Sequence, residues 1–234
     1  MTALGKLAGA AFCGLVFPAL AHHPGDSRVE VVPPAQFALP PAGSYALPPI
    51  QQAPDGQVLD ASGYFRTLSE FTTGRITLLG LVYTRCADPE GCPRATWAFS
   101  AVRGLLRADP GLQRRVRLVT LSFDPVHDQF DAIAAYAERM RGKRAGADWH
   151  FITTPSKRAL APILDGLGQD LRVAIDSQAV PGTEEFTHSL KVFLIDPDAR
   201  VREIYSTGYL VPQMIVNDMK TIAVEYPRAS SAQR

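Results

Sequence analysis

The sequence predicts an α/β fold in which helices flank a central mixed sheet, and three observations lead to it. The apolar run Ile76–Tyr83 is typical of a strand buried on both faces, and Val116–Ser122 predicts a second strand. Each is followed by a stretch with helical periodicity, Ala95–Leu106 and Phe130–Met140. Two alternating segments within Leu190–Tyr205, joined by an Asp-Pro-Asp-Ala turn, predict a β-hairpin that completes the sheet.

The remaining elements follow from local signals. An Asp-Gly turn and two short apolar pairs predict an N-terminal hairpin, and a proline at a first helical turn marks the last helix. The expected elements are a hairpin from Val58-Leu59 and Tyr64-Phe65, an extended segment His150–Ile152, a helix capped by Ser156 that ends near Leu167, an extra strand Leu171–Ile175, and a helix from Pro212 to about Val224.

The composition fits one domain of ordinary size with extensions. The chain has 234 residues, of which 46% are hydrophobic, which is enough for a packed core. Its formal charge is +1, from 24 basic and 23 acidic residues. With this balance we expect no nucleic-acid partner and no broad attraction to an anionic membrane.

The first residues have the organisation of an export signal. Lys6 supplies positive charge, Leu7–Leu20 is apolar, and Ala19 and Ala21 are the small residues that a signal peptidase requires. Cleavage after Ala21 would remove Cys13 and leave the mature protein in the periplasm, without strong membrane binding. The apolar run is shorter than the roughly 20 residues of a membrane span, so an uncleaved anchor in the inner membrane is the less favoured alternative.

Four segments follow from these features: a signal peptide (1–21), a proline-rich N-terminal arm (22–53), a folded domain (54–226) and a C-terminal tail (227–234). Eight prolines lie between positions 24 and 54. Proline lacks a backbone donor and favours an extended conformation, so the arm is either a spacer or a strap packed on the domain.

Cys86 and Cys92 are the only cysteines expected in the mature chain. They lie where the first buried strand ends and a helix begins near Pro93. The positive end of a helix dipole stabilises thiolate over thiol, and Arg85 and Arg94 favour the thiolate in the same way. Because thiolate is both a nucleophile and a soft metal ligand, we expect the function to reside at this loop.

Four segments share one family pattern. They are the strand and cysteine loop Leu81–Pro93, the Ser-x-Asp-Pro segment in Leu118–Pro125, Thr187–Ser189 entering Lys191–Asp198, and the strand and helix in Tyr205–Met219. Together they resemble the Sco/SenC family, thioredoxin-fold proteins that handle copper in the assembly of respiratory oxidases. The resemblance covers roughly residues 48–224 and implies a thioredoxin-like sheet.

This resemblance implies a copper site formed by Cys86, Cys92 and His188. Two thiolates and one imidazole suit Cu(I), which accepts few soft ligands, whereas structural Zn²⁺ usually has four protein ligands. Cu(II) would also bind if the imidazole stays engaged. The implied function is an exported metallochaperone that passes copper by ligand exchange to a copper-requiring exported or membrane protein, with a cytochrome oxidase subunit as the implied recipient.

Two features depart from the family pattern, the cysteine loop and the N-terminal signal. Five residues separate Cys86 from Cys92 instead of the usual three, and Asp88 and Glu90 add negative charge beside the metal position. Both changes bear on metal affinity and on the balance between metal binding and redox chemistry. The signal also looks cleavable, whereas many relatives stay anchored in the membrane.

The same cysteines support two other functions. In a thiol-disulfide oxidoreductase or redox sensor, Cys86 and Cys92 would be the redox-active pair, one attacking a partner's disulfide and the other resolving the mixed disulfide. Thioredoxin-like reductases present a proline to the cysteine pair, but Phe186–Ser189 contains none, which favours a metal ligand there. An inert structural disulfide is the third alternative, although so short a loop would stabilise little.

Other titratable residues are weaker candidates. Asp124 and Asp128, which bracket His127, precede a helix and are interpreted as helix caps rather than catalytic groups. His150 is interpreted as structural. The pair His22-His23 would follow the signal cleavage site, where a free amine beside imidazoles chelates Cu(II), but dispensable residues are the favoured interpretation.

Overall fold

The structure is a computed structural model that describes residues 38–86, 88, 91–142, 146–169, 171–174, 185–188 and 190–227, with the backbone alone described for 171–174 and 185–188. The predicted signal peptide, the arm up to residue 37 and the tail from residue 228 lie outside these residues, and their assignments stay predictions. The elements are β1 (Gln51–Gln52), β2 (Gln57–Asp60), β3 (Phe65–Thr67), α1 (Ser69–Thr72), β4 (Ile76–Val82), α2 (Cys92–Leu106), α3 (Pro110–Gln113), β5 (Val116–Ser122), α4 (Phe130–Arg141), β6 (Asp148–Thr153), α5 (Lys157–Gly166), β7 (Leu171–Ala174), β8 (Glu185–His188), β9 (Lys191–Ile195), β10 (Arg200–Ser206), the 3₁₀ turn η1 (Thr207–Tyr209) and α6 (Pro212–Glu225).

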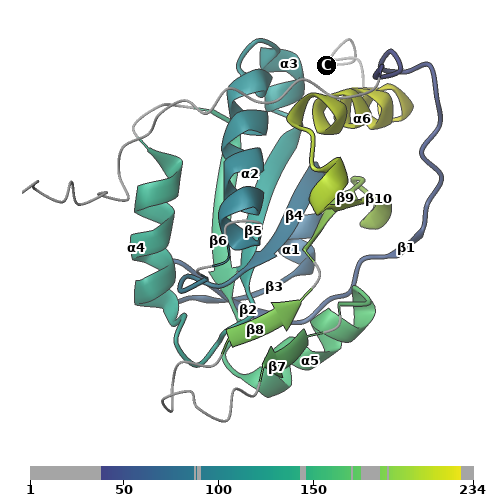
Figure 1. Ribbon diagram of the computed structural model, residues 1–234. Coiled ribbons are helices and arrows are strands. Elements are labelled where there is room, and N and C mark those ends of the chain that lie inside the picture. The colour runs from purple at the N-terminus through teal and green to yellow at the C-terminus, as the bar shows by residue number, and fades with distance from the viewer. Residues whose placement is uncertain are drawn as a thin grey trace, which may run out of the picture. The chain divides into compact units, whose positions relative to one another are not determined.

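Within the described residues, eight strands form one mixed sheet in the order β1-β10-β9-β4-β5-β6-β2-β3, and β7 and β8 pair separately. The neighbours β4, β5 and β6 are parallel, whereas β9 runs antiparallel to β4 and to β10. Every residue of β4 and β5 is buried, and α2 lies between α4 and α6 over the sheet (Figure 1). The predicted α/β fold, a thioredoxin-like mixed sheet flanked by helices with an N-terminal hairpin (β2–β3), is confirmed.

Close packing sets the distance between α2 and the middle of the sheet. Gly80 lies in the centre of β4, and a Cβ at this position would stand 2.9 Å from the ring of Phe99 on α2. The glycine therefore lets the buried Phe99 ring rest directly on the strand backbone. Since α2 begins with Cys92, this contact also fixes the position of that cysteine relative to the sheet.

Two short helices, α1 and α3, are absent from the sequence-based prediction. Each has four residues, too few to show hydrophobic periodicity. The signal for α3 is local: the side chain of Asp109 accepts the N–H of Leu112 at 2.9 Å, and Pro110 occupies the first turn. The predicted cap of α5 is confirmed, because Ser156 Oγ accepts the N–H of Ala159 at 3.2 Å.

The described part of the proline-rich arm, residues 38–53, packs on α6 and β10. Its strand β1 pairs antiparallel with β10, and the N–H of Gly43 donates to Thr221 Oγ1 at 2.9 Å. The hydroxyl of Tyr45 donates to the carboxylate of Asp218, whose pKa is raised by burial. Of the two alternatives, spacer or strap, the strap is therefore correct for these residues.

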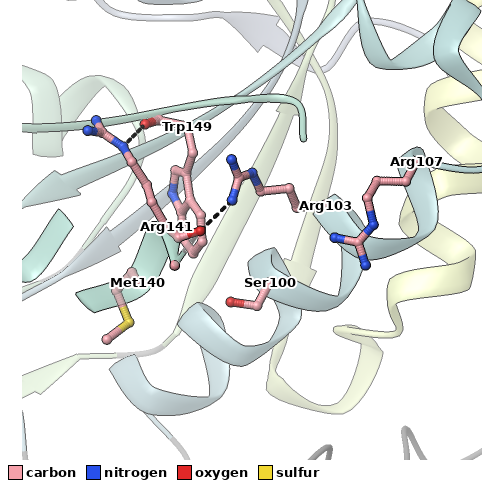
Figure 2. Close-up of a pocket in the computed structure, with 7 residues that line it drawn as sticks. Ser100, Arg103, Arg107, Met140, Arg141 and Trp149 are labelled. Carbon is pink, nitrogen blue, oxygen red and sulfur yellow. Dashed lines mark hydrogen bonds between the residues drawn. The ribbon is translucent and has the colours of Figure 1, made fainter. Parts of the chain in front are cut away.

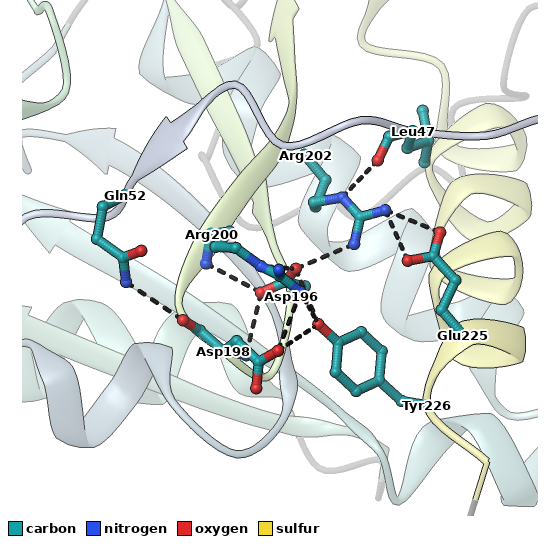
Figure 3. A network of polar contacts seen from close by, with 8 residues as sticks. All are labelled: Leu47, Gln52, Asp196, Asp198, Arg200, Arg202, Glu225 and Tyr226. Atoms are coloured by element: carbon teal, nitrogen blue, oxygen red, sulfur yellow. Dashed lines mark hydrogen bonds and ion pairs between the residues drawn. The ribbon is translucent and has the colours of Figure 1, made fainter.

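A buried ion-pair network joins the arm, the β9–β10 hairpin and α6 (Figure 3). Nη1 of Arg202 lies 3.0 Å from Oδ2 of Asp196, and the two side chains are 4% and 0% exposed. The same guanidinium donates to both carboxylate oxygens of Glu225 at 2.8 Å and to the carbonyl of Leu47. This network lies at the hairpin turn, away from the end of β9 that adjoins the cysteine loop, so its role is structural.

Candidate metal and thiol site

The two cysteines lie where β4 ends and α2 begins, as the sequence predicts. The N–H of Cys86 donates to the carbonyl of Tyr83 at 3.2 Å, which closes a turn after the strand. Cys92 is the first residue of α2 and is 1% exposed, and its sulfur accepts the N–H of Tyr83 at 3.4 Å. Both thiols are free, and Cys86 is half-buried. The loop therefore holds one accessible sulfur and one buried sulfur.

A hydrogen bond between the two side chains determines which sulfur carries the negative charge. The bond from Cys92 lowers the pKa of Cys86, and burial opposes this only in part. The same bond, together with burial, raises the pKa of Cys92. Both shifts favour the thiolate on Cys86, the more accessible sulfur for a partner disulfide or a metal ion. A thiolate with a buried thiol behind it suits both soft-metal binding and disulfide exchange.

Arg85, the residue before Cys86, contacts a buried carboxylate. Its Nη2 lies 3.2 Å from Oδ2 of Asp124 and 2.6 Å from Nδ1 of His127. Nδ1 of His127 is in turn 2.9 Å from Oδ2 of Asp124, which is 1% exposed. These contacts attach Arg85 to the segment that follows β5. They also bring the positive charge of Arg85 to the Asp124 carboxylate.

A second buried carboxylate, that of Asp128, holds the turn between β4 and Cys86. It is 0% exposed and accepts from the N–H of Thr84 at 2.9 Å, from the hydroxyl of Thr84 at 2.5 Å and from the hydroxyl of Ser122 at 2.6 Å. Since Ser122 ends β5, the carboxylate joins the loop after one strand to the end of its parallel neighbour. The cysteine loop is thus anchored on its N-terminal side.

The interpretation of Asp124 and Asp128 as helix caps is wrong. Helix α4 begins at Phe130, and Gln129 occupies its N-cap position without a side-chain hydrogen bond to the helix. Both carboxylates instead face donors at the ends of β4 and β5, because the carboxyl ends of parallel strands lie at one edge of the sheet. The sequence signal for this arrangement is a pair of aspartates within six residues of the end of a fully buried strand.

The backbone of His188 approaches the same edge of the sheet. Val192 of β9 pairs with Gly80 of the antiparallel β4, so the chain before Val192 leads toward the end of β4 and its cysteine loop. Among the side chains that the structure describes, no three His, Cys, Asp or Glu residues gather at a metal position, and the side chain of His188 is not one of these. The ligand set Cys86, Cys92 and His188 stays a prediction.

His150 lies away from this loop in β6. Its ring packs edge-on against Phe71, with 5.2 Å between the ring centroids, and burial lowers its pKa. These contacts fit the structural interpretation of His150. The pair His22-His23 lies outside the described residues.

A family model described as SCO1/SenC matches residues 53–223. The chain belongs to the SCO1/SenC family. The resemblance found in the sequence is thereby confirmed. Within the described part of this SCO1/SenC chain, no helix has both the length and the apolar composition needed to cross a bilayer.

Solved structures share the fold of this SCO1/SenC protein. ScoI of Bradyrhizobium japonicum, solved with copper bound, superposes with a TM-score of 0.58 at 19% identity, over 73% of this chain and 98% of that one. Apo Sco1 from Thermus thermophilus gives 0.59 at 21%, over 80% and 97%. BsSco, described as a Sco-family cytochrome c oxidase assembly protein with a disulfide switch, gives 0.57 at 19%, over 76% and 97%. At these identities the likeness establishes the fold. Comparison with curated protein sequences finds no match.

Proposed function

We propose that this SCO1/SenC protein is an exported copper metallochaperone. It binds copper through Cys86, Cys92 and His188 and delivers the metal to a copper-requiring exported or membrane protein in the periplasm. A cytochrome oxidase subunit is the proposed recipient. Cu(I) is the main cargo, and Cu(II) also binds as long as the imidazole of His188 remains a ligand of the metal.

One observation carries this proposal: two free cysteines lie at a strand-to-helix loop, and the accessible one has a lowered pKa that favours its thiolate. Thiolates are preferred ligands of Cu(I), and a metal held by few ligands on loops is released readily by ligand exchange. The copper bound to the Bradyrhizobium relative supports copper as cargo. The description of BsSco as an oxidase assembly protein supports the proposed recipient.

An anaerobic Cu(I) titration of the reduced protein against a chromophoric competitor tests the proposal. We expect one Cu(I) per chain and a large loss of affinity in each of Cys86→Ser, Cys92→Ser and His188→Ala. His127→Gln is the matched control, because this imidazole is already engaged by Asp124. Loss of binding in His127→Gln with full binding in His188→Ala would refute the proposed third ligand.

Thiol-disulfide exchange is the second candidate function, and the lowered pKa of Cys86 favours it. The Cys86 thiolate would attack a partner disulfide, forming a mixed disulfide and releasing one partner thiolate. Cys92 would lose its proton and attack the Cys86 sulfur, which releases the second partner thiolate and leaves a Cys86–Cys92 disulfide. Two electrons thus pass from the pair to the partner.

The two functions differ in their need for the imidazole. Reduction of a model disulfide that proceeds equally fast in wild type and His188→Ala, without tight Cu(I) binding in either protein, would favour the oxidoreductase. Tight Cu(I) binding that depends on His188, with slow disulfide reduction, would favour the metallochaperone.

A further inference from the structure

A pocket of about 360 Å³ lies between the second half of α2, the end of α4 and the start of β6 (Figure 2). Its labelled lining residues are Ser100, Arg103, Arg107, Met140, Arg141 and Trp149. Arg103 lies eleven residues after Cys92 on the same helix, a distance of about 16 Å at 1.5 Å per residue. The pocket is therefore separate from the cysteine loop.

Two of the arginines are held by backbone carbonyl groups. Nε of Arg103 donates to the carbonyl of Ala147 at 3.0 Å, and its Nη1 donates to the carbonyl of Arg141 at 2.7 Å. A Cβ on Gly146 would stand 2.9 Å from Cγ and Nε of Arg103, so the glycine makes room for this side chain. Nε of Arg141 donates to the carbonyl of Trp149 at 2.8 Å. The guanidinium groups are thus positioned without carboxylate partners.

The described residues neutralise the positive charge of the pocket only in part, through the nearby charge of Asp148. No acidic side chain lines it, and none of Arg103, Arg107 and Arg141 forms an ion pair within the described part of the chain. Asp148, the acidic residue beside the pocket, is paired with Arg75 at 2.6 Å. Burial, and then the nearby charges of Arg141 and Arg107, lower the pKa of Arg103, and the charge of Asp148 opposes this in part. A bound anion would relieve this repulsion.

We propose that this pocket binds a phosphate group. Arg103 in the last turns of α2 and Arg107 at its C-cap are four residues apart, and guanidinium groups match the geometry and charge of phosphate oxygens. The hydroxyl of Ser100 adds a neutral donor, while Met140 and Trp149 offer apolar contact to the rest of a ligand. The phosphate is either free, as in a small phosphate compound, or part of an anionic lipid headgroup.

Calorimetric titration of the metal-free protein with pyrophosphate, at constant ionic strength, tests the site. We expect one saturable site and an affinity about tenfold lower in Arg107→Gln, because this exposed arginine contributes charge-assisted hydrogen bonds but no described structural contact. Arg158→Gln, an equal loss of charge on α5, is the matched control and should bind as wild type does. Absence of saturable binding, or equal weakening in both variants, would overturn the proposal.

Sedimentation with vesicles distinguishes the two sources of phosphate. Wild type that co-sediments with phosphatidylglycerol-containing vesicles but not with pure phosphatidylcholine, and loses this in Arg107→Gln, identifies a lipid headgroup. Saturable pyrophosphate binding without vesicle binding identifies a free phosphate compound. Neither measurement involves copper or thiols, so the outcome is independent of the proposed metallochaperone function.

Discussion

Replacing Asp128 by alanine should destabilise the fold and loosen the cysteine loop. The carboxylate is 0% exposed and accepts three hydrogen bonds, one from Ser122 and two from Thr84. A hydrogen bond to a charged group contributes about 1.5–3 kcal/mol. Because Thr84 is only half-buried, its donors would bond to water in the variant, and we count them at about half. The expected loss in the free energy of unfolding is then about 3–6 kcal/mol.

Urea denaturation followed by circular dichroism measures this loss, and the melting temperature should fall by about 6–24 °C for a chain of this size. Asp131→Ala is the matched control, because Asp131 is exposed on α4 and accepts only from the adjacent N–H of Ala132. The alkylation rate of Cys86 should change in the Asp128 variant alone. A loss below about 1 kcal/mol, or equal losses in both variants, would refute the anchoring role.

Three further outcomes follow from buried contacts. Iodoacetamide should label Cys86 at pH values well below the pKa of about 8.5 of a free cysteine. Cys92→Ala should raise the pH at which labelling begins, since the Cys92 hydrogen bond is the main cause of the lowered pKa. Mass spectrometry of the labelled protein across pH checks this, and an unchanged profile in the variant would contradict it. Gly80→Ala should cost about 1–3 kcal/mol in urea denaturation through its clash with Phe99, whereas a neutral result would mean that the ring moves aside freely. Burial lowers the pKa of His150 in the folded state, so the unfolded chain binds more protons and stability falls as pH drops below about 6.5. The melting temperature should therefore fall less with decreasing pH in His150→Phe than in wild type. Identical slopes of melting temperature against pH in the two proteins would assign the effect to other groups.

The buried centre of the fold could be predicted from the sequence because its signals are local. Strand β5 coincides with the predicted Val116–Ser122, and β4 ends one residue before the prediction. Continuous apolar runs leave little choice of conformation when both faces are buried. The position of Cys86 and Cys92 between strand and helix follows from the same boundaries.

The partners of polar side chains could not be predicted in this way. Asp128 accepts from Thr84, 44 residues earlier in the chain, and Arg85 reaches Asp124 across 39 residues. Such pairs depend on which strands become parallel neighbours, and the residue types alone do not reveal this. The same holds for the thiols, because only their mutual hydrogen bond shows that Cys86 rather than Cys92 carries the charge.

This asymmetry gives the metal-binding and the thiol-exchange functions a common first step. The first cause of the raised pKa of Cys92 is its hydrogen bond to Cys86, and the charge on Cys86 acts in the same direction. When Cys86 bonds to a metal ion or to a partner's sulfur, its negative charge is neutralised and it ceases to be a strong acceptor. Both effects lower the pKa of Cys92, so the buried thiol loses its proton more easily once Cys86 is occupied. For the two proposed functions the expected order is therefore Cys86 first and Cys92 second, and only the contribution of a third ligand separates the two.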